Sequence, residues 1–195
     1  MYKQFISSAR LLPFASLALI LFSACKKEDK NDPNPNQQEV ITTLSLALTD
    51  SAGGTSSICR FYDADGDGGI QGTADTIRLL ANRTYYASIT LLDESTTPAD
   101  TISKEVRAEA NEHQFFFNSS IAALKVRYDP KDYDTNMPPK PVGLQTIWQA
   151  GLAQTASLLI VLKHQPDIKS KINNTTGDQT KGETDILVNF PVVVR

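Results

Sequence analysis

The chain has 195 residues, a formal net charge of −3, two cysteines and two histidines. Its length fits a single domain of ordinary size. The mildly acidic balance argues against a nucleic-acid partner, because binding to phosphates needs clustered lysine and arginine side chains.

Residues 1–24 form the first predicted segment and are typical of a signal peptide. Lys3 and Arg10 precede an apolar run from Leu11 to Phe22, and the segment has no acidic residue. A helix that spans a bilayer needs about 20 apolar residues, more than this run supplies. We therefore expect the segment to direct export and to be cleaved off.

Cys25 is the expected lipidation site. The stretch "LFSAC" that it ends resembles a lipobox, although Phe22 stands where Leu or Val is usual. The resemblance implies diacylglycerol on the Cys25 thiol and an acyl chain on its amine, and several lipid chains hold a protein firmly on a membrane. The alternative is an ordinary cleaved signal with an incidental cysteine.

Residues 25–38 are predicted to be a lipidated flexible tether. The charged stretch "KKEDK" at Lys26–Lys30 resembles the signal that sends Bacteroidetes-type lipoproteins to the outer face of the outer membrane. A plain solvated charge run is the alternative interpretation. The following Asn- and Pro-rich stretch lacks apolar residues and cannot offset the entropy of ordering.

Residues 39–195 are predicted to be one all-β domain. Leu44, Leu46 and Leu48 fall on one face of a strand, which is the period-2 pattern of a half-buried strand. About nine short strands favour an antiparallel β-sandwich of Ig-like architecture, with a barrel as the alternative. The predicted strands span residues 40–49, 57–62, 76–80, 84–92, 114–117, 124–128, 143–148, 157–163 and 185–194.

One short helix is predicted within residues 98–112. It follows a proline, Asp100 or Thr101 can cap it, and Ile102 and Val106 form a narrow apolar stripe. We expect this helix to pack across one end of the sandwich.

Two further features concern burial. Three consecutive phenylalanines, Phe115–Phe117, place rings on both faces of a strand, so they predict either a ligand or partner surface or a core covered by the helix. Cys59 has no disulfide partner if Cys25 is lipidated, and it is expected to be a buried, inert thiol.

The stretch "DADGDGG" at residues 63–69 predicts a calcium site. Asp63, Asp65 and Asp67 alternate before a glycine, as in the first half of a calcium loop. The second half departs from that pattern, because Ala74 stands where a bidentate Glu is expected and Asp75 comes one residue late. An Asp- and Gly-rich turn without calcium is the other interpretation.

The only two histidines, His113 and His164, lie in similar contexts, "EHQF" and "KHQP". A histidine pair can bind zinc or copper, or haem iron axially, and Glu112 or Asp167 would have to complete a zinc site. The alternative is that each histidine hydrogen-bonds the backbone at a strand end.

Enzymatic activity is not expected. The sequence has no G-x-S-x-G, H-E-x-x-H, P-loop or G-x-G-x-x-G motif.

Several stretches together resemble a group of small Bacteroidetes outer-membrane lipoproteins over nearly all of the mature chain. They are "SAC", "EVITTLSLALT", "DADGDGG", "EHQFFF", "VGLQTIWQAG", "LKHQP" and "GETDILVNFPV". The resemblance implies a location and a family without an established activity.

Two functional hypotheses follow. The first is a cell-surface binding module, accessory to a TonB-dependent outer-membrane receptor that takes up a metal or a metal complex. The second is a structural or adhesion lipoprotein with a calcium-stiffened loop.

Overall fold

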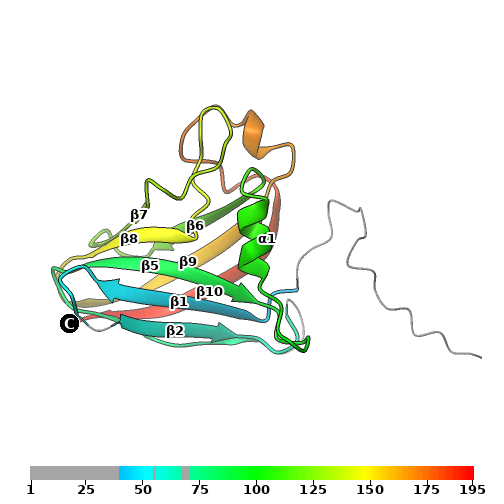
Figure 1. Ribbon diagram of the computed structural model, residues 1–195. Helices are drawn as coiled ribbons and strands as arrows, with labels where there is room; N and C mark the ends of the chain where they lie inside the picture. Colours follow the sequence, from blue (N-terminus) through cyan, green and yellow to red (C-terminus); the bar gives the residue numbers. More distant parts are fainter. Residues whose placement is uncertain (1–39, 55, 67–70) are drawn as a thin grey trace, which may run out of the picture. The chain divides into compact units, whose positions relative to one another are not determined.

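Ten strands, one α-helix and one 3-10 helix make up the described part of the chain, residues 40–54, 56–66 and 71–195, in a computed structural model (Figure 1). The predicted signal peptide, Cys25, the tether and Asp67 lie outside these residues. The strands are β1 (Thr43–Asp50), β2 (Ser56–Tyr62), β3 (Thr73–Ala74), β4 (Ile77–Leu79), β5 (Thr84–Leu92), β6 (His113–Ser119), β7 (Leu124–Tyr128), β8 (Gln145–Ala150), β9 (Gln154–His164) and β10 (Glu183–Val194). The helices are α1 (Ile102–Ala108) and the 3-10 helix η1 (Lys169–Lys171).

The strands form two sheets. The first has the order β3-β2-β1-β5-β8-β7 and the second the order β4-β10-β9-β6. All neighbours are antiparallel except β4 and β10, and one sheet curls into a half-barrel. Figure 1 shows the two sheets one behind the other. The predicted all-β sandwich with one short helix is thereby confirmed.

The core lies between the sheets and follows the predicted alternation. Leu44, Leu46 and Leu48 are all fully buried, as are Trp148 of β8 and Phe190 of β10. Each such side chain stabilises the fold by roughly 1.5–3 kcal/mol relative to an exposed one. The core is thus built from residues that the period-2 pattern identifies.

Helix α1 is shorter than the predicted segment 98–112. Asp100 forms a backbone bridge with Asp93, so the chain stays extended there and the helix begins only after Thr101. Thr101 is the N-cap residue, but its side chain makes no capping hydrogen bond. Ile102 and Val106 are buried as expected, and α1 packs mainly on β5.

The aromatic run is covered rather than exposed. Phe115 is fully buried, Phe116 is 8% exposed, and Phe117 packs edge-on against Trp148. Cys59 is a free, buried thiol, as predicted, and burial raises its pKa. Neither feature therefore offers an exposed binding surface.

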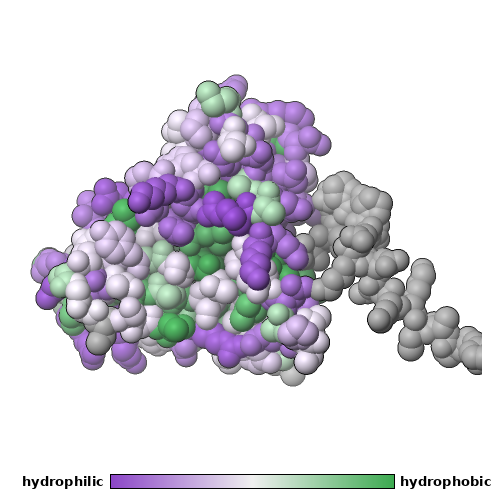
Figure 2. Space-filling view, viewed as in Figure 1, coloured by the Kyte–Doolittle hydropathy of each residue, from purple (hydrophilic) through white to green (hydrophobic). Residues whose placement is uncertain are grey.

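The face drawn in Figure 2 carries mostly hydrophilic side chains. On the face drawn in Figure 2, hydrophilic side chains separate the apolar ones into small groups. Within the described residues, no helix has the length and apolar character needed to cross a membrane. The loops that follow β7 and β9 project from the same end of the sandwich (Figure 1). The candidate site lies at that end.

Candidate metal centre

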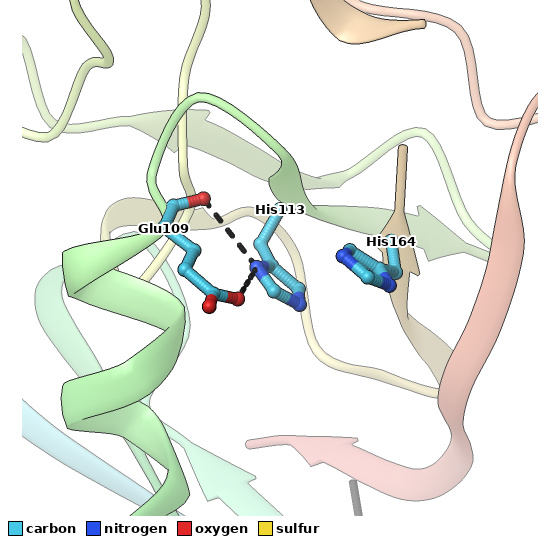
Figure 3. A group of neighbouring side chains, drawn as sticks. All are labelled: Glu109, His113 and His164. Atoms are coloured by element: carbon cyan, nitrogen blue, oxygen red, sulfur yellow. Dashed lines mark hydrogen bonds and ion pairs between the residues drawn. The ribbon is translucent and has the colours of Figure 1, made fainter. Parts of the chain in front are cut away.

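His113 and His164 lie side by side. His113 begins β6, His164 ends β9, and the antiparallel register pairs the two residues directly. Their rings stack with centroids 4.4 Å apart and an interplanar angle of 7° (Figure 3). Both residues are buried, at 2% and 8% exposure. The structure thus brings together the two histidines that the sequence singled out.

Three carboxylates surround the pair. Glu109 Oε2 lies 3.7 Å from His113 Nδ1, and Asp185 Oδ2 lies 3.6 Å from His113 Nε2. Glu112 Oε2 lies 3.5 Å from His164 Nε2. Of the two acids predicted to complete a zinc site, Glu112 is therefore close to the pair.

Asp167, the other predicted acid, is not part of the cluster. It is exposed in the turn after β9, with a positive φ of 57°. No ion pair joins it to either histidine among the described residues. Glu109 instead lies beside the pair, because the end of α1 brings the Glu109 carboxylate to the His113 ring.

Asp185 reaches the cluster through a β-bulge. In the β10–β9 ladder, Thr184 pairs with Lys163 and Ile186 with Leu162, so Asp185 is an extra residue in β10. The insertion buries both Asp185 and Ile186, although neighbours in a regular strand face opposite sides. Bulges commonly re-aim a side chain next to a functional site. The sequence shows only an acid before an apolar run, which does not reveal the bulge.

Burial sets the protonation of the cluster. It lowers the pKa of His113 to about 4, assisted by the neighbouring His164 and by Lys169. It also raises the pKa of Asp185 to about 6 and, together with Glu112, raises the pKa of Glu109. At neutral pH His113 is therefore a neutral imidazole, the form that binds metal ions.

Two polar atoms of the cluster lack hydrogen-bond partners. They are His164 Nε2 and Asp185 Oδ2, both buried. A buried polar group without a partner costs about 1–3 kcal/mol, and more when it is charged. A ligand that occupied the cluster would recover this cost.

Glu109, His113 and His164 can supply a metal ion with three ligand atoms. These atoms all lie within 4.8 Å of one another, and no other such group of three occurs in the described residues. Two imidazoles and a carboxylate form a ligand set that zinc uses in proteins, with a fourth position for water or another ligand.

The stacked rings must move to bind an ion. A metal ion lies near the plane of each imidazole that binds it, and parallel stacked planes do not converge on one point. Ligand atoms of a tetrahedral zinc site are about 3.4 Å apart, so a rotation of one ring and a small shift of Glu109 are required. The Cβ–ring torsion of histidine is broad, which makes such a rotation inexpensive. Adjacent stacked rings leave no space for a haem between them.

Lys169 fixes the position of His113. Its ammonium group donates to the backbone oxygens of Ala110 and His113, both at 2.7 Å, and pairs with Asp134 Oδ2 at 3.1 Å. Lys169 is fully buried, and burial lowers its pKa to about 8, so it remains charged at neutral pH. The stretch "KSK" at residues 169–171 contains no pattern that predicts this role.

Among the described residues, the predicted calcium ligands Asp63, Asp65 and Asp75 do not form a group of three ligand atoms within 4.8 Å of one another. Asp75 Oδ2 accepts a hydrogen bond from the Arg60 backbone amide, whereas Asp63 and Asp65 line a cavity together with Asp185. Asp67 lies outside the described residues, so the calcium loop stays a prediction.

Comparisons of the chain with protein-family models, with curated proteins and with solved structures give no match. The fold and the site define a two-sheet β-sandwich protein with a buried histidine–carboxylate cluster.

Proposed function

We propose that the protein is a lipid-anchored binding module of the cell envelope whose histidine cluster binds a divalent transition metal ion. The observation that carries the proposal is the stacked pair His113–His164, buried beside Glu109 and with an unpartnered ring nitrogen. Imidazole nitrogen with carboxylate oxygen suits Zn²⁺ and Cu²⁺ better than Ca²⁺, which prefers oxygen ligands alone.

The location is part of the same proposal. The lipobox-like stretch before Cys25 and the charges that follow it support an anchor on the outer membrane, with the domain facing outward. An outer-membrane receptor that takes up the metal or its complex is the proposed partner. A structural or adhesion lipoprotein with calcium bound at residues 63–75 is the competing function.

Titration calorimetry tests the metal site. We would purify the protein in detergent from membranes of cells that express the full sequence, and titrate it with Zn²⁺, Cu²⁺ and Ca²⁺. We expect one Zn²⁺ or Cu²⁺ per chain, and a loss of about tenfold or more in affinity for His113→Gln or His164→Gln. Asp167→Asn is the matched control, because it removes a nearby exposed carboxylate outside the cluster.

The outcomes separate the two functions. Binding of Ca²⁺ alone would favour the structural alternative. Equal transition-metal affinity of the wild type and both histidine variants would show that the ion binds elsewhere. Circular dichroism of each variant would establish that a lost affinity does not come from unfolding.

Intact-mass analysis of the same preparation tests the anchor. A chain that begins at Cys25 and carries lipid is expected, and Cys25→Ser should leave an unlipidated precursor. An unmodified chain cleaved at another residue would overturn this part of the proposal.

A further inference from the structure

A second feature of the described residues lies next to the cluster but outside the metal ligand set. A cavity of about 400 Å³ opens between the loop after β2 and the start of β10. Asp63, Asp65 and Asp185 line it, and none of the described residues that line it is basic. Its volume falls within the usual range for small-molecule sites, about 300–1,000 Å³.

Two carboxylates of this cavity have buried oxygens without partners. Asp63 Oδ1 and Asp185 Oδ2 make no hydrogen bond, and Asp185 is only 6% exposed. These two residues come from separate elements, and the bulge in β10 turns Asp185 inward. Unpaired acceptors on two sides of an acidic cavity call for a ligand that carries hydrogen-bond donors and positive charge.

The spacing of the acids argues against a single metal ion. Calcium binds oxygen at about 2.4 Å, so its ligand atoms lie within about 4.8 Å of one another. Asp63, Asp65 and Asp185 do not form such a group, since the described residues contain only the histidine cluster at that spacing. Two separate cationic groups joined by a spacer fit this arrangement better.

The remaining wall of the cavity is apolar. Ile41, Phe61 and Leu187 contribute to it. Methylene groups gain free energy when they leave water for such a surface, while charged groups at their ends would pair with the carboxylates.

We propose that this cavity binds a small aliphatic diamine, with one ammonium group at Asp185, the other at Asp63, and the methylene chain against Phe61 and Ile41. The site shares Asp185 with the histidine cluster, but it includes none of the three proposed metal ligands. A cell-surface protein with this site would capture a cationic organic solute from outside the cell.

Calorimetry with 1,4-diaminobutane on the detergent-purified full protein tests this inference. We expect one diamine per chain, an affinity for 1-aminobutane lower by about tenfold or more, and no binding of 1,4-butanediol, because each lost ammonium group removes a charge-assisted hydrogen bond. Asp63→Asn and Asp185→Asn should each lower the affinity for the diamine by about tenfold or more. Asp167→Asn should leave it unchanged.

Other variants and probes keep the two sites distinguishable. The His164→Gln variant should no longer bind the transition metal but should still bind the diamine. The Asp63→Asn variant should bind the metal but not the diamine. Both asparagine variants are expected to fold, since each removes a buried, unpaired carboxylate oxygen. Absence of diamine heat, equal affinity in all variants, or displacement of the diamine by equimolar Ca²⁺ would overturn the proposal.

Discussion

His113 lies between two sets of buried polar side chains, the Lys169 network and the histidine cluster. They differ in how many of their polar atoms have hydrogen-bond partners. Lys169 uses its three donors on Ala110, His113 and Asp134, which is the full capacity of an ammonium group. The histidine cluster on the other side leaves His164 Nε2 and Asp185 Oδ2 without partners. All donors of Lys169 are thus used within the protein, whereas two polar atoms of the histidine cluster have no hydrogen-bond partner in it.

In the loop after β7, both carboxylate oxygens of Asp132 have partners, as all three donors of Lys169 do. Asp132 Oδ2 accepts from the backbone amides of Gly143 and Gln145, and its Oδ1 pairs with Arg107. Saturated networks of this kind hold the loops in place. The contrast teaches that buried charged groups occur in this protein both with and without unused hydrogen-bonding capacity, and that the proposed metal site lies where ionisable groups keep such capacity.

The largest expected effect comes from breaking the saturated group. Lys169→Met leaves Asp134 buried without its cation, and removal of one partner of a buried ion pair costs about 3–5 kcal/mol. We expect that loss in the free energy of unfolding, measured by urea denaturation. Lys171→Met, at an exposed position of the same 3-10 helix, is the control and should change stability by about 0.5 kcal/mol or less. Equal losses in both variants would contradict the assigned role.

The sequence predicts the strands well but does not reveal how the candidate site is assembled, for one physical reason. Alternation of Leu44, Leu46 and Leu48 is a local signal that depends only on which face is buried. The contact between His113 and His164 depends instead on the β6–β9 register, which no local pattern specifies.

The residues that the sequence did not predict also reach the site through contacts between distant parts of the chain. Asp185 enters the cluster only because β10 has a bulge, and Glu109 only because α1 ends before it. Lys169 is buried because distant carbonyl oxygens converge on it. The similar contexts of the two histidines are the signal in the sequence, and of the carboxylates near the pair only Glu112 is predicted from it.

The pH dependence of stability should reveal the unsaturated group. Between pH 4 and 6, the folded protein keeps His113 neutral and Asp185 protonated, whereas the unfolded chain has a charged histidine and a charged aspartate. Each state then binds one proton at these two residues, so their contributions to the slope of stability against pH cancel.

Single substitutions should remove the cancellation. In Asp185→Asn only the titration of His113 remains, and the unfolded chain binds the histidine proton more readily than the folded protein. Stability relative to wild type should therefore rise by about 2 kcal/mol between pH 4 and 6. In His113→Gln only Asp185 remains, and relative stability should fall by a similar amount over that range. Urea denaturation in metal-free buffer measures both profiles. Parallel profiles for the variants and the wild type would mean that neither group is titrated as described.

The smallest expected effect tests whether an unused acceptor by itself defines a ligand site. Gln114 is fully buried, and its Nε2 donates to the Thr176 backbone oxygen at 2.8 Å and to the Tyr128 hydroxyl at 3.5 Å. Its Oε1 has no partner. Gln114→Met loses one short hydrogen bond worth about 1 kcal/mol and one long, weak bond, and it also removes the unsatisfied oxygen, so stability should change by about 1 kcal/mol or less.

Gln165→Met provides the matched comparison at the other strand end. Gln165 also has an unpartnered Oε1, but its Nε2 donates to two backbone oxygens, those of Asp178 and Lys181. We expect this variant to be less stable than Gln114→Met by about 1 kcal/mol, because both hydrogen bonds of Gln165 are short, at 2.7 and 2.9 Å, whereas one of the two bonds of Gln114 is long, at 3.5 Å. A loss of about 3 kcal/mol or more for Gln114→Met would instead show that its oxygen has a partner, and would extend the unsaturated group from the histidines to this residue.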